Sequence, residues 1–345
     1  MTEVLAAHTT LRLGGPASKF VVAGSEDALV AEVRDAGPDG LLMAGGSNLV
    51  VADHGYDGTV IHVRTRGVKS DDAGAKAILT VQAGENWDAL VARAVDEGLA
   101  GVECLSGIPG SVGATPIQNV GAYGQDVAET ITGVRVYDRV RDEVLELAPA
   151  GCGFGYRTSR FKRDPSHFAV LSVQFALDRQ ETSRPLRYVE LANALGVSVG
   201  ASAPLRDVRE AVLALRRSKG MVLDPSDLDT VSAGSFFTNP ILDAAAYAEL
   251  ESRTGADARP PRFPEPDGAI KTSAAWLIDN AGFHKGYGNP DGIAISSKHP
   301  LALTNRGNGT TAELVALARE IAEGVNNKFG VSLAPEPVFV GHQWT

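Results

Sequence analysis

The chain has 345 residues, of which 44% are hydrophobic and 21% are charged. This length exceeds one typical domain, so we expect two or three domains with a sizeable core. The net charge of −10 argues against a nucleic-acid or anionic-membrane surface, since both need a basic face. No apolar run approaches the roughly 18 residues that span a bilayer, and residues 1–20 show no signal-peptide pattern. Cys104 and Cys152 lack CxxC spacing, which fits a reducing, cytoplasmic compartment.

The first two-thirds of the chain alternate short apolar runs with amphipathic stretches. The β-branched runs predict strands at residues 58–63, 77–83 and 168–178, and a pair of strands around a charged turn in 133–148. The stretch 84–98 is predicted to be a helix, because Trp87, Leu90 and Val91 share one face and Gly98 stops it.

The remaining elements follow at 205–219, predicted to be a helix, and at 310–330, where Thr310 and Glu313 have capping-box spacing. RPPRFPEP (259–266) cannot hold a central strand or a helix, and we expect a surface loop. Strands and helices without a strict βαβ rhythm indicate α+β architecture, with a boundary near Gly220.

Two glycine-rich stretches are candidate ligand cradles. AGGSNLVV (44–51) lies between strand-like runs, and GIPGSVGATPIQNVGAYG (107–124) has five glycines and no charged residue. Successive backbone amides in such loops form a concave nest for an anion such as pyrophosphate. Any single glycine is explained more simply as loop punctuation, but so long an uncharged loop favours a ligand. Neither stretch is a Rossmann GxGxxG, because neither opens a helix after a strand.

Three further segments could carry chemistry. In FGYRTSRFKRD (154–164), Arg157 follows glycine and aromatic residues that suit carboxylate binding, although a charge run is usually a solvated loop. GSFFTNP (234–240) carries the hydroxyl of Ser235 and no charged side chain. Glu336, between two prolines, fits either an edge position or a site carboxylate. The histidines show no HExxH or paired metal spacing, so we expect no catalytic metal, and there is no GxSxG elbow.

Together, IPGSVGATPIQNVGAYG, GYRTSRFK, AGSFFTNP, AAWLID and the terminal PE resemble, in this order, the UDP-N-acetylenolpyruvoylglucosamine reductase family, also called UDP-N-acetylmuramate dehydrogenases. The resemblance runs from about Thr10 to Gly341. It implies a bilobed FAD-binding domain over 1–219, of the type shared with vanillyl-alcohol oxidase and p-cresol methylhydroxylase. A C-terminal α+β substrate-binding domain would span 220–345, and its last strand, about 331–341, could return to the FAD domain.

The same resemblance implies the activity. The chain would reduce UDP-N-acetylglucosamine enolpyruvate to UDP-N-acetylmuramate for peptidoglycan synthesis, using non-covalent FAD and NADPH as the hydride donor. We expect a cytoplasmic monomer or weak dimer that has no nucleic-acid or membrane partner.

Residue roles carry over from the matching motifs. Arg157 would be the catalytic arginine, Ser235 the proton donor and Glu336 the catalytic acid. Tyr188, in PLRYVEL, matches the tyrosine of the longer family subtype that closes over the substrate. The UDP phosphates would be held by Lys219 and Asn239, with Arg216 near them. The expected FAD contacts are Gly45, Gly46, Ser47, Asn48, Leu49, Ser106, Gly107, Ile108, Pro109, Gly110, Ser111, Gly113, Ala114, Gln118, Asn119, Gly121, Ala122 and Tyr123.

The chain departs from the family pattern at Ala334 and Val338, where the family often has Leu and a basic residue, so the electrostatics around Glu336 could differ. Mechanistically, Arg157 and Glu336 would stabilise the charge that develops beside the substrate carboxylate, and Ser235 would supply a proton. Phe236 and Phe237 would keep water away from that hydroxyl.

Two other functions stay open on the sequence. A flavin oxidase of the same fold would usually attach its flavin covalently through His or Cys. No histidine lies within 104–125, but Cys104 remains a candidate. A non-enzymatic protein that binds a flavin or a nucleotide sugar would not need Arg157, Ser235 and Glu336 together.

Overall fold

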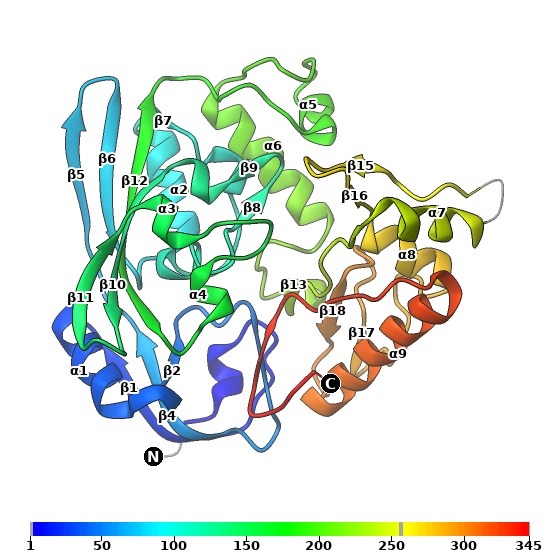
Figure 1. Ribbon diagram of the computed structural model, residues 1–345, viewed down its shortest axis with the longest axis horizontal. Coiled ribbons are helices and arrows are strands. Elements are labelled where there is room, and N and C mark those ends of the chain that lie inside the picture. The colour runs from blue at the N-terminus through cyan, green and yellow to red at the C-terminus, as the bar shows by residue number, and fades with distance from the viewer. Residues whose placement is uncertain (1–2, 255–257, 345) are drawn as a thin grey trace. The chain divides into compact units, whose positions relative to one another are not determined.

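The computed structural model describes residues 3–254 and 258–344, which divide into two compact units (Figure 1). The first unit comprises Ala17–Gly46 and Asp57–Val222, and the second comprises Val4–Pro16, Ser47–Tyr56 and residues 223–344. The two N-terminal segments join the second unit because Leu11, Leu13 and Val50 are buried in its core. The functional domain limits drawn from the sequence stay a prediction, and their outer ends lie outside the described residues.

A six-stranded antiparallel sheet in the order β11-β10-β12-β6-β5 forms the centre of the first unit, and β7 pairs with β12. Val173 on β12 pairs with Val134 on β10 and with Val81 on β6, and all three are fully buried. The burial of these three paired valines explains why the sequences of the strands are rich in β-branched residues. The strands are β5 (Val68–Ala73), β6 (Lys76–Gln82), β7 (Leu99–Ala100), β10 (Ile131–Asp138), β11 (Glu143–Leu147) and β12 (Phe168–Arg179).

A smaller sheet in the order β1-β4-β2 and several helices complete this unit. α2 begins at Trp87, later than predicted, because the Asn86 side chain caps the helix by accepting a 2.9 Å hydrogen bond from the Ala89 N–H. The Trp87 ring is buried against Phe175 of β12. These elements are β1 (Ala17–Ala23), β2 (Leu41–Met43), β4 (Tyr56–Val63), α1 (Glu26–Ala36), α2 (Trp87–Asp96), α3 (Pro149–Cys152), α4 (Arg160–Arg163), α5 (Val189–Ala194) and α6 (Leu205–Ser218).

The second unit contains three small sheets, ordered β13-β18-β17, β14-β16-β15 and β19-β3. β19 and β3 run parallel and join residues from the two ends of the chain. The strands are β3 (Leu49–Val51), β13 (Ser232–Ser235), β14 (Ile241–Leu242), β15 (Phe263–Pro264), β16 (Ile270–Lys271), β17 (Ile293–Ile295), β18 (Ala302–Asn305) and β19 (Val338–Val340). The helices are α7 (Ala244–Ser252), α8 (Ala274–Ala281) and α9 (Thr311–Phe329).

Most predicted elements are confirmed, including the strand–turn–strand around Gly45 and the helix after Thr310. Thr310 and Glu313 form the predicted capping box at the start of α9. The loop prediction for 259–266 is wrong at β15, which pairs with β16 at the edge of its sheet. Pro264 is tolerated there because an edge position does not require its missing N–H. Within the described ranges, no helix is both long enough and apolar enough to cross a bilayer.

A buried carboxylate ties together the sheet that carries β13. Asp229 accepts hydrogen bonds from the Ser297 N–H at 2.8 Å, from the Ser297 hydroxyl at 2.5 Å and from Arg306 at 3.1 Å. Burial alone would raise the pKa of Asp229, but the Ser297 donors and the Arg306 charge outweigh it and hold the pKa below its usual value. The ionised side chain therefore stabilises the folded second unit.

Asp229→Asn should lower the free energy of unfolding at pH 7 by about 2 kcal/mol, because the amide removes the negative charge and replaces one of the two acceptor oxygens by a donor. A group with a depressed folded pKa contributes stability above its unfolded pKa and loses it as the pH falls through the folded value. The difference between wild type and variant should therefore shrink below about pH 4. Urea unfolding at several pH values measures it, with exposed Asp291→Asn as the control. A difference that does not change with pH would contradict the assignment.

Candidate active site

Two glycine-rich turns of the first unit approach each other at backbone distance. A Cβ atom on Gly45 would lie 2.7 Å from the Cα of Gly110, which is closer than a side chain permits. Gly46 and Gly110 also have left-handed backbone, with φ of 57° and 121°. The two turns can therefore meet only because these positions are glycine.

The middle of the stretch 107–124 is bonded to the turn that follows β6. Val112 and Gly113 donate backbone hydrogen bonds, each of 2.9 Å, to the carbonyls of Glu85 and Ala83. A Cβ on Gly113 would lie 2.5 Å from the Ala83 side chain. Packing thus requires glycine at position 113, whatever the loop binds.

A buried hydroxyl in this stretch has no protein partner. Ser111 is 5% exposed, and within the described chain its Oγ atom has no hydrogen-bond partner. Buried polar atoms are rarely left unpaired unless a ligand or water satisfies them. Ser111 follows Gly110, so the unpaired hydroxyl belongs to the turn that meets Gly45. This arrangement suits a ligand that carries hydrogen-bond acceptors, such as a phosphate.

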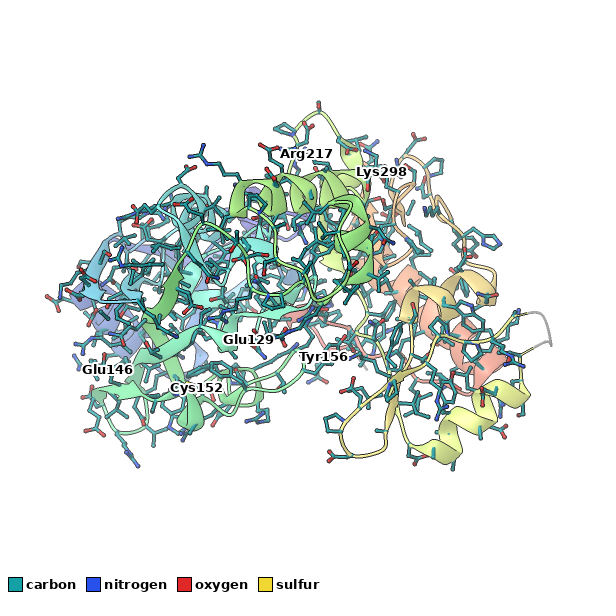
Figure 2. The ribbon with its side chains drawn as sticks, turned by 90° about the horizontal axis from the view of Figure 1, so that it is seen from above. Glu129, Glu146, Cys152, Tyr156, Arg217 and Lys298 are labelled. Carbon is teal, nitrogen blue, oxygen red and sulfur yellow. The ribbon has the colours of Figure 1, made fainter. Side chains whose placement is uncertain are left out.

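Arg157 lies on the segment between α3 and α4, just after Tyr156, which is labelled in Figure 2. Its guanidinium donates to the carbonyls of Gly121 and Asn119 and lies 3.8 Å from an Asp126 carboxylate oxygen. The Asn119 side chain in turn donates to the Gly155 carbonyl at 3.1 Å. The glycine-rich loop and the arginine segment therefore hold each other in place.

The backbone of this region is strained. Only five non-glycine residues of the described chain have left-handed φ angles, and three of them are Asn119, Tyr123 and Arg157. Such conformations cost energy and cluster at functional sites, where the surrounding structure enforces them. The strain supports the sequence prediction that this loop and Arg157 belong to one site.

Two neighbouring cations have partners outside the glycine-rich loop. Arg160 lies over the Phe168 ring at 4.7 Å, and Arg163 donates to the Gly153 carbonyl at 3.2 Å. Arg157, whose side chain is 22% exposed, contacts the glycine-rich loop and is therefore not part of a purely solvated charge run.

Tyr188 and Lys219 meet at Tyr123 in the same unit. Tyr188 packs edge-on against Tyr123, with ring centroids 5.4 Å apart, and Lys219 Nζ lies 5.7 Å from the Tyr123 ring. Burial raises the pKa of Tyr123 to about 12, so its hydroxyl stays a donor at neutral pH. Glu190, which the sequence reading did not single out, forms a 2.6 Å ion pair with Lys219. Tyr188 is 45% exposed and therefore accessible to a ligand.

A second ion pair supports the start of the glycine-rich loop. Asp88 forms a bidentate pair with Arg209, at 2.7 and 3.0 Å, and accepts the Gly107 N–H at 2.6 Å. Arg216 of α6 lies beside Gly107. It precedes Arg217, which is labelled in Figure 2. Its Nε atom is buried and has no partner in the described chain, and burial lowers the pKa of Arg216. No sequence motif signalled Asp88 or Arg209, because their contact spans 121 residues.

Ser235 ends strand β13 of the second unit, directly after Gly234, whose φ is 76°. A register shift separates the pairing of Ser232 from that of Ser235 on β18. The irregularity re-aims the end of the strand, a use that bulges often have next to active sites. Ser235 is partly exposed, whereas the two residues after it are buried.

Glu336 is fixed next to Ser235 by backbone pairing in the same unit. Its N–H donates to the Phe236 carbonyl at 2.8 Å, and the Thr238 N–H donates to the Ala334 carbonyl at 3.0 Å. On the other side, Asn48 donates through its side chain to the Glu336 carbonyl at 3.4 Å. Three sequence-predicted residues, Asn48, Ser235 and Glu336, thus lie around one segment.

The departures at Ala334 and Val338 leave this pairing intact. Val338 donates its N–H to the Asn48 carbonyl at 2.9 Å, and both side chains are exposed. The two positions act through backbone atoms. Asn239, by contrast, accepts the Ala274 N–H at 3.0 Å and so caps the first turn of α8.

Phe236 and Phe237 are buried directly after Ser235. Both rings are at most 2% exposed and belong to the hydrophobic core of the second unit. They pack against each other and against Trp344. Their position anchors the backbone that carries Ser235.

Cys104 is a poor candidate for covalent flavin attachment. The residue is 2% exposed, and burial raises the pKa of its thiol far above the usual range. A buried neutral thiol is a weak nucleophile. This observation disfavours the oxidase alternative with a cysteine-linked flavin.

The predicted site residues are distributed over both units. The first unit carries Arg157, Tyr188, Arg216 and Lys219, together with Gly45, Gly46 and the loop from Ser106 to Tyr123. The second carries Ser235, Asn239 and Glu336, together with Ser47, Asn48 and Leu49. Lys219 and Asn239, both expected at the phosphates, therefore belong to different units.

Comparisons with known proteins identify the family. The description "FAD binding domain" matches residues 17–148, and "UDP-N-acetylenolpyruvoylglucosamine reductase, C-terminal domain" matches residues 224–340. The UDP-N-acetylenolpyruvoylglucosamine reductase of Thermobifida fusca is 57% identical and covers 98% of this chain and 96% of its own length. The enzyme of that name from Streptomyces coelicolor is 55% identical and covers 98% of this chain and 89% of its own length.

A solved structure agrees in fold. The UDP-N-acetylenolpyruvylglucosamine reductase of Thermus caldophilus superposes with a TM-score of 0.67 at 24% identity, covering 99% of this chain and 98% of its own. The fold is therefore α+β, with an FAD-binding fold of the vanillyl-alcohol oxidase type followed by the family's C-terminal domain. Identity above one half over nearly the whole length leaves one conclusion: this chain belongs to the UDP-N-acetylenolpyruvoylglucosamine reductase family.

Proposed function

We propose that Arg157, Ser235 and Glu336 carry out the reaction of the family in this chain. The chain is an FAD-dependent oxidoreductase that reduces UDP-N-acetylglucosamine enolpyruvate to UDP-N-acetylmuramate in peptidoglycan synthesis, with NADPH as the hydride donor. FAD, held by the first unit, would supply the hydride transfer between NADPH and the terminal carbon of the enolpyruvyl group. Substrate binding, charge stabilisation and protonation are left to the protein's side chains.

The observation that carries the proposal is the pairing of residues 236–238 with 334–336. It places the hydroxyl of Ser235 and the carboxyl of Glu336 on neighbouring segments within one unit. Backbone bonds thereby hold Ser235 and Glu336, which lie near the two ends of the domain, on adjacent segments.

Arg157 would bind the substrate carboxylate. A guanidinium presents a planar fork of donors that matches a carboxylate, and the Gly121 and Asn119 carbonyls orient this one. Negative charge develops next to the carboxylate when the hydride arrives, so a fixed cation there lowers the barrier.

Ser235 would protonate the carbon next to the carboxylate. A hydroxyl is a weak acid, but a developing carbanion is basic enough to accept its proton. Glu336 would assist as a neutral acid, by donating a hydrogen bond where this negative charge develops. The aromatic core behind Ser235 limits the mobility of its backbone, which favours a defined donor position.

The first unit fits FAD. The unpaired Ser111 hydroxyl and the glycine turns at Gly45 and Gly110 offer donors and close backbone approach to a dinucleotide. We propose that the sequence-predicted contacts at 45–49 and 106–123 hold it. Tyr188, Arg216, Lys219 and Asn239 would bind the UDP diphosphate. We also propose a cytoplasmic location, because NADPH is an intracellular coenzyme. A monomeric or weakly dimeric state is proposed with it.

The flavin should be bound without a covalent link, since Cys104 is buried with a raised thiol pKa. Acid precipitation of the purified yellow protein should release the flavin into the supernatant. Absorbance at the flavin band in supernatant and pellet measures it. A yellow pellet would contradict the assignment.

Ser235→Ala should separate the two half-reactions. Bleaching of FAD by NADPH needs no proton from this hydroxyl and should stay within about twofold of wild type, whereas reoxidation by the enolpyruvyl substrate should slow by about 10²–10⁴-fold. Ser235→Cys should recover part of that loss. Anaerobic stopped-flow absorbance of the flavin reads both steps.

Ser232→Ala is the matched control, because it removes a buried hydroxyl from the same strand. It should leave the ratio of the two rates unchanged. If Ser235→Ala slowed both steps equally, the serine would be structural, and Glu336 would be the next candidate for the proton donor.

Tyr188→Phe should mainly raise the KM for the UDP-sugar. A hydrogen bond from a hydroxyl to a charged phosphate contributes about 1.5–3 kcal/mol, and the rings of Tyr188 and Tyr123 would keep their packing. Steady-state kinetics measure KM and kcat, with Tyr287→Phe in the second unit as the control. An unchanged KM in Tyr188→Phe would remove this residue from the substrate site.

A further inference from the structure

Residues 341–344, which we call the tail, fold back onto the segment that follows Ser235. Phe236, Phe237, Phe339 and Trp344 form an aromatic group, which we call the tail cluster. The Trp344 ring lies 6.3 Å from Phe236, 6.0 Å from Phe237 and 5.7 Å from Phe339, measured between ring centroids. All four residues belong to the second unit.

Hydrogen bonds hold the tail in this position. Arg319 on α9 donates to the Trp344 carbonyl at 2.9 and 3.1 Å and to the Gln343 carbonyl at 3.4 Å. His342 Nε2 lies 3.0 Å from the carbonyl oxygen of Val50. The tail is thus fixed to a helix and to β3, and its indole is directed at the core behind Ser235.

The backbone around Ser235 depends on this support. Gly234, with its φ of 76°, has no side chain to restrict the chain before the serine. After the serine, the Phe236 N–H donates to the Leu301 carbonyl at 2.7 Å, and the Phe236 carbonyl accepts the Glu336 N–H at 2.8 Å. A shift of the Phe236 ring would therefore turn the peptide next to Ser235 and move Glu336 with it.

Trp344 borders an open pocket. The pocket has a volume of about 560 Å³ and is also lined by α9 residues such as Arg319 and Asn326 and by Leu333. Loss of the indole would extend this pocket toward Phe236 and Phe237 and let water reach these rings. Large-to-small substitutions are most disruptive where neighbours cannot close the gap.

We propose that Trp344 is a positioning residue for Ser235 and Glu336, acting through the rings of Phe236 and Phe237. The inference rests on the proposed roles of those two residues. It assigns a function in the substrate half-reaction to Trp344, which would act through other side chains. A displacement of about 1 Å at a catalytic group can cost roughly 100-fold in rate. A small shift of the Phe236 and Phe237 rings after loss of the indole is therefore enough to slow the reaction.

Trp344→Ala should slow flavin reoxidation by the enolpyruvyl substrate at least 10-fold, with bleaching by NADPH within twofold of wild type. Trp344→Phe should retain most of the rate, because a ring still fills the site. Phe283→Ala is the control: this ring belongs to the same core and packs against Tyr287, outside the tail cluster. It should lower the Tm without changing the ratio of the two rates.

A second readout does not require turnover. In Ser235→Cys, the rate of thiol alkylation by iodoacetamide reports the setting of position 235, since Cys104 and Cys152 are buried with raised thiol pKa values. Adding Trp344→Ala should change this rate at least fivefold, and adding Phe283→Ala should not. Equal effects of the two substitutions on both readouts would overturn the inference. If wild type itself did not reduce the enolpyruvyl substrate, the proposed function would fail, and the thiol comparison would still decide the positioning role.

Discussion

The second unit depends on the backbone hydrogen bonds of residues 334–338, which pair on one side with 236–238 and on the other with Asn48. These bonds join the beginning, the middle and the end of the chain at one place. Each needs only main-chain atoms or one amide side chain, so Ala334 and Val338 can replace other residues without loss of pairing. The backbones of the serine and of the acid in the proposed mechanism are therefore held close together by main-chain pairing.

The first unit solves a different problem, that of holding a neutral loop in a strained shape. Three residues there, Asn119, Tyr123 and Arg157, have left-handed backbone, and each makes contacts that fix it. Glycines at the meeting point of the two turns supply the close approach that side chains would prevent. The backbone hydrogen bonds of Val112 and Gly113 hold this loop to the turn that follows β6.

Two cations near the proposed site of the first unit are paired with carboxylates. The chain is acidic overall, yet the cations of the first-unit site have individual partners: Lys219 pairs with Glu190, and Arg209 pairs with Asp88. A partly exposed ion pair such as that of Lys219 contributes little to stability. It can therefore exchange its carboxylate for a phosphate at small cost, as substrate binding would require.

Local pattern alone predicted most elements, because strand and helix periodicity is written in neighbouring residues: β12, α6 and the capping box of α9 all lie where the sequence places them. Motif order likewise indicated the family. The sequence could not show that Leu11 and Val50 complete the second core, that Phe236 and Phe237 are buried, or that Trp344 packs behind Ser235. These features are contacts between residues far apart in the chain. They depend on the burial of apolar surface in the folded structure, which local sequence propensities do not describe.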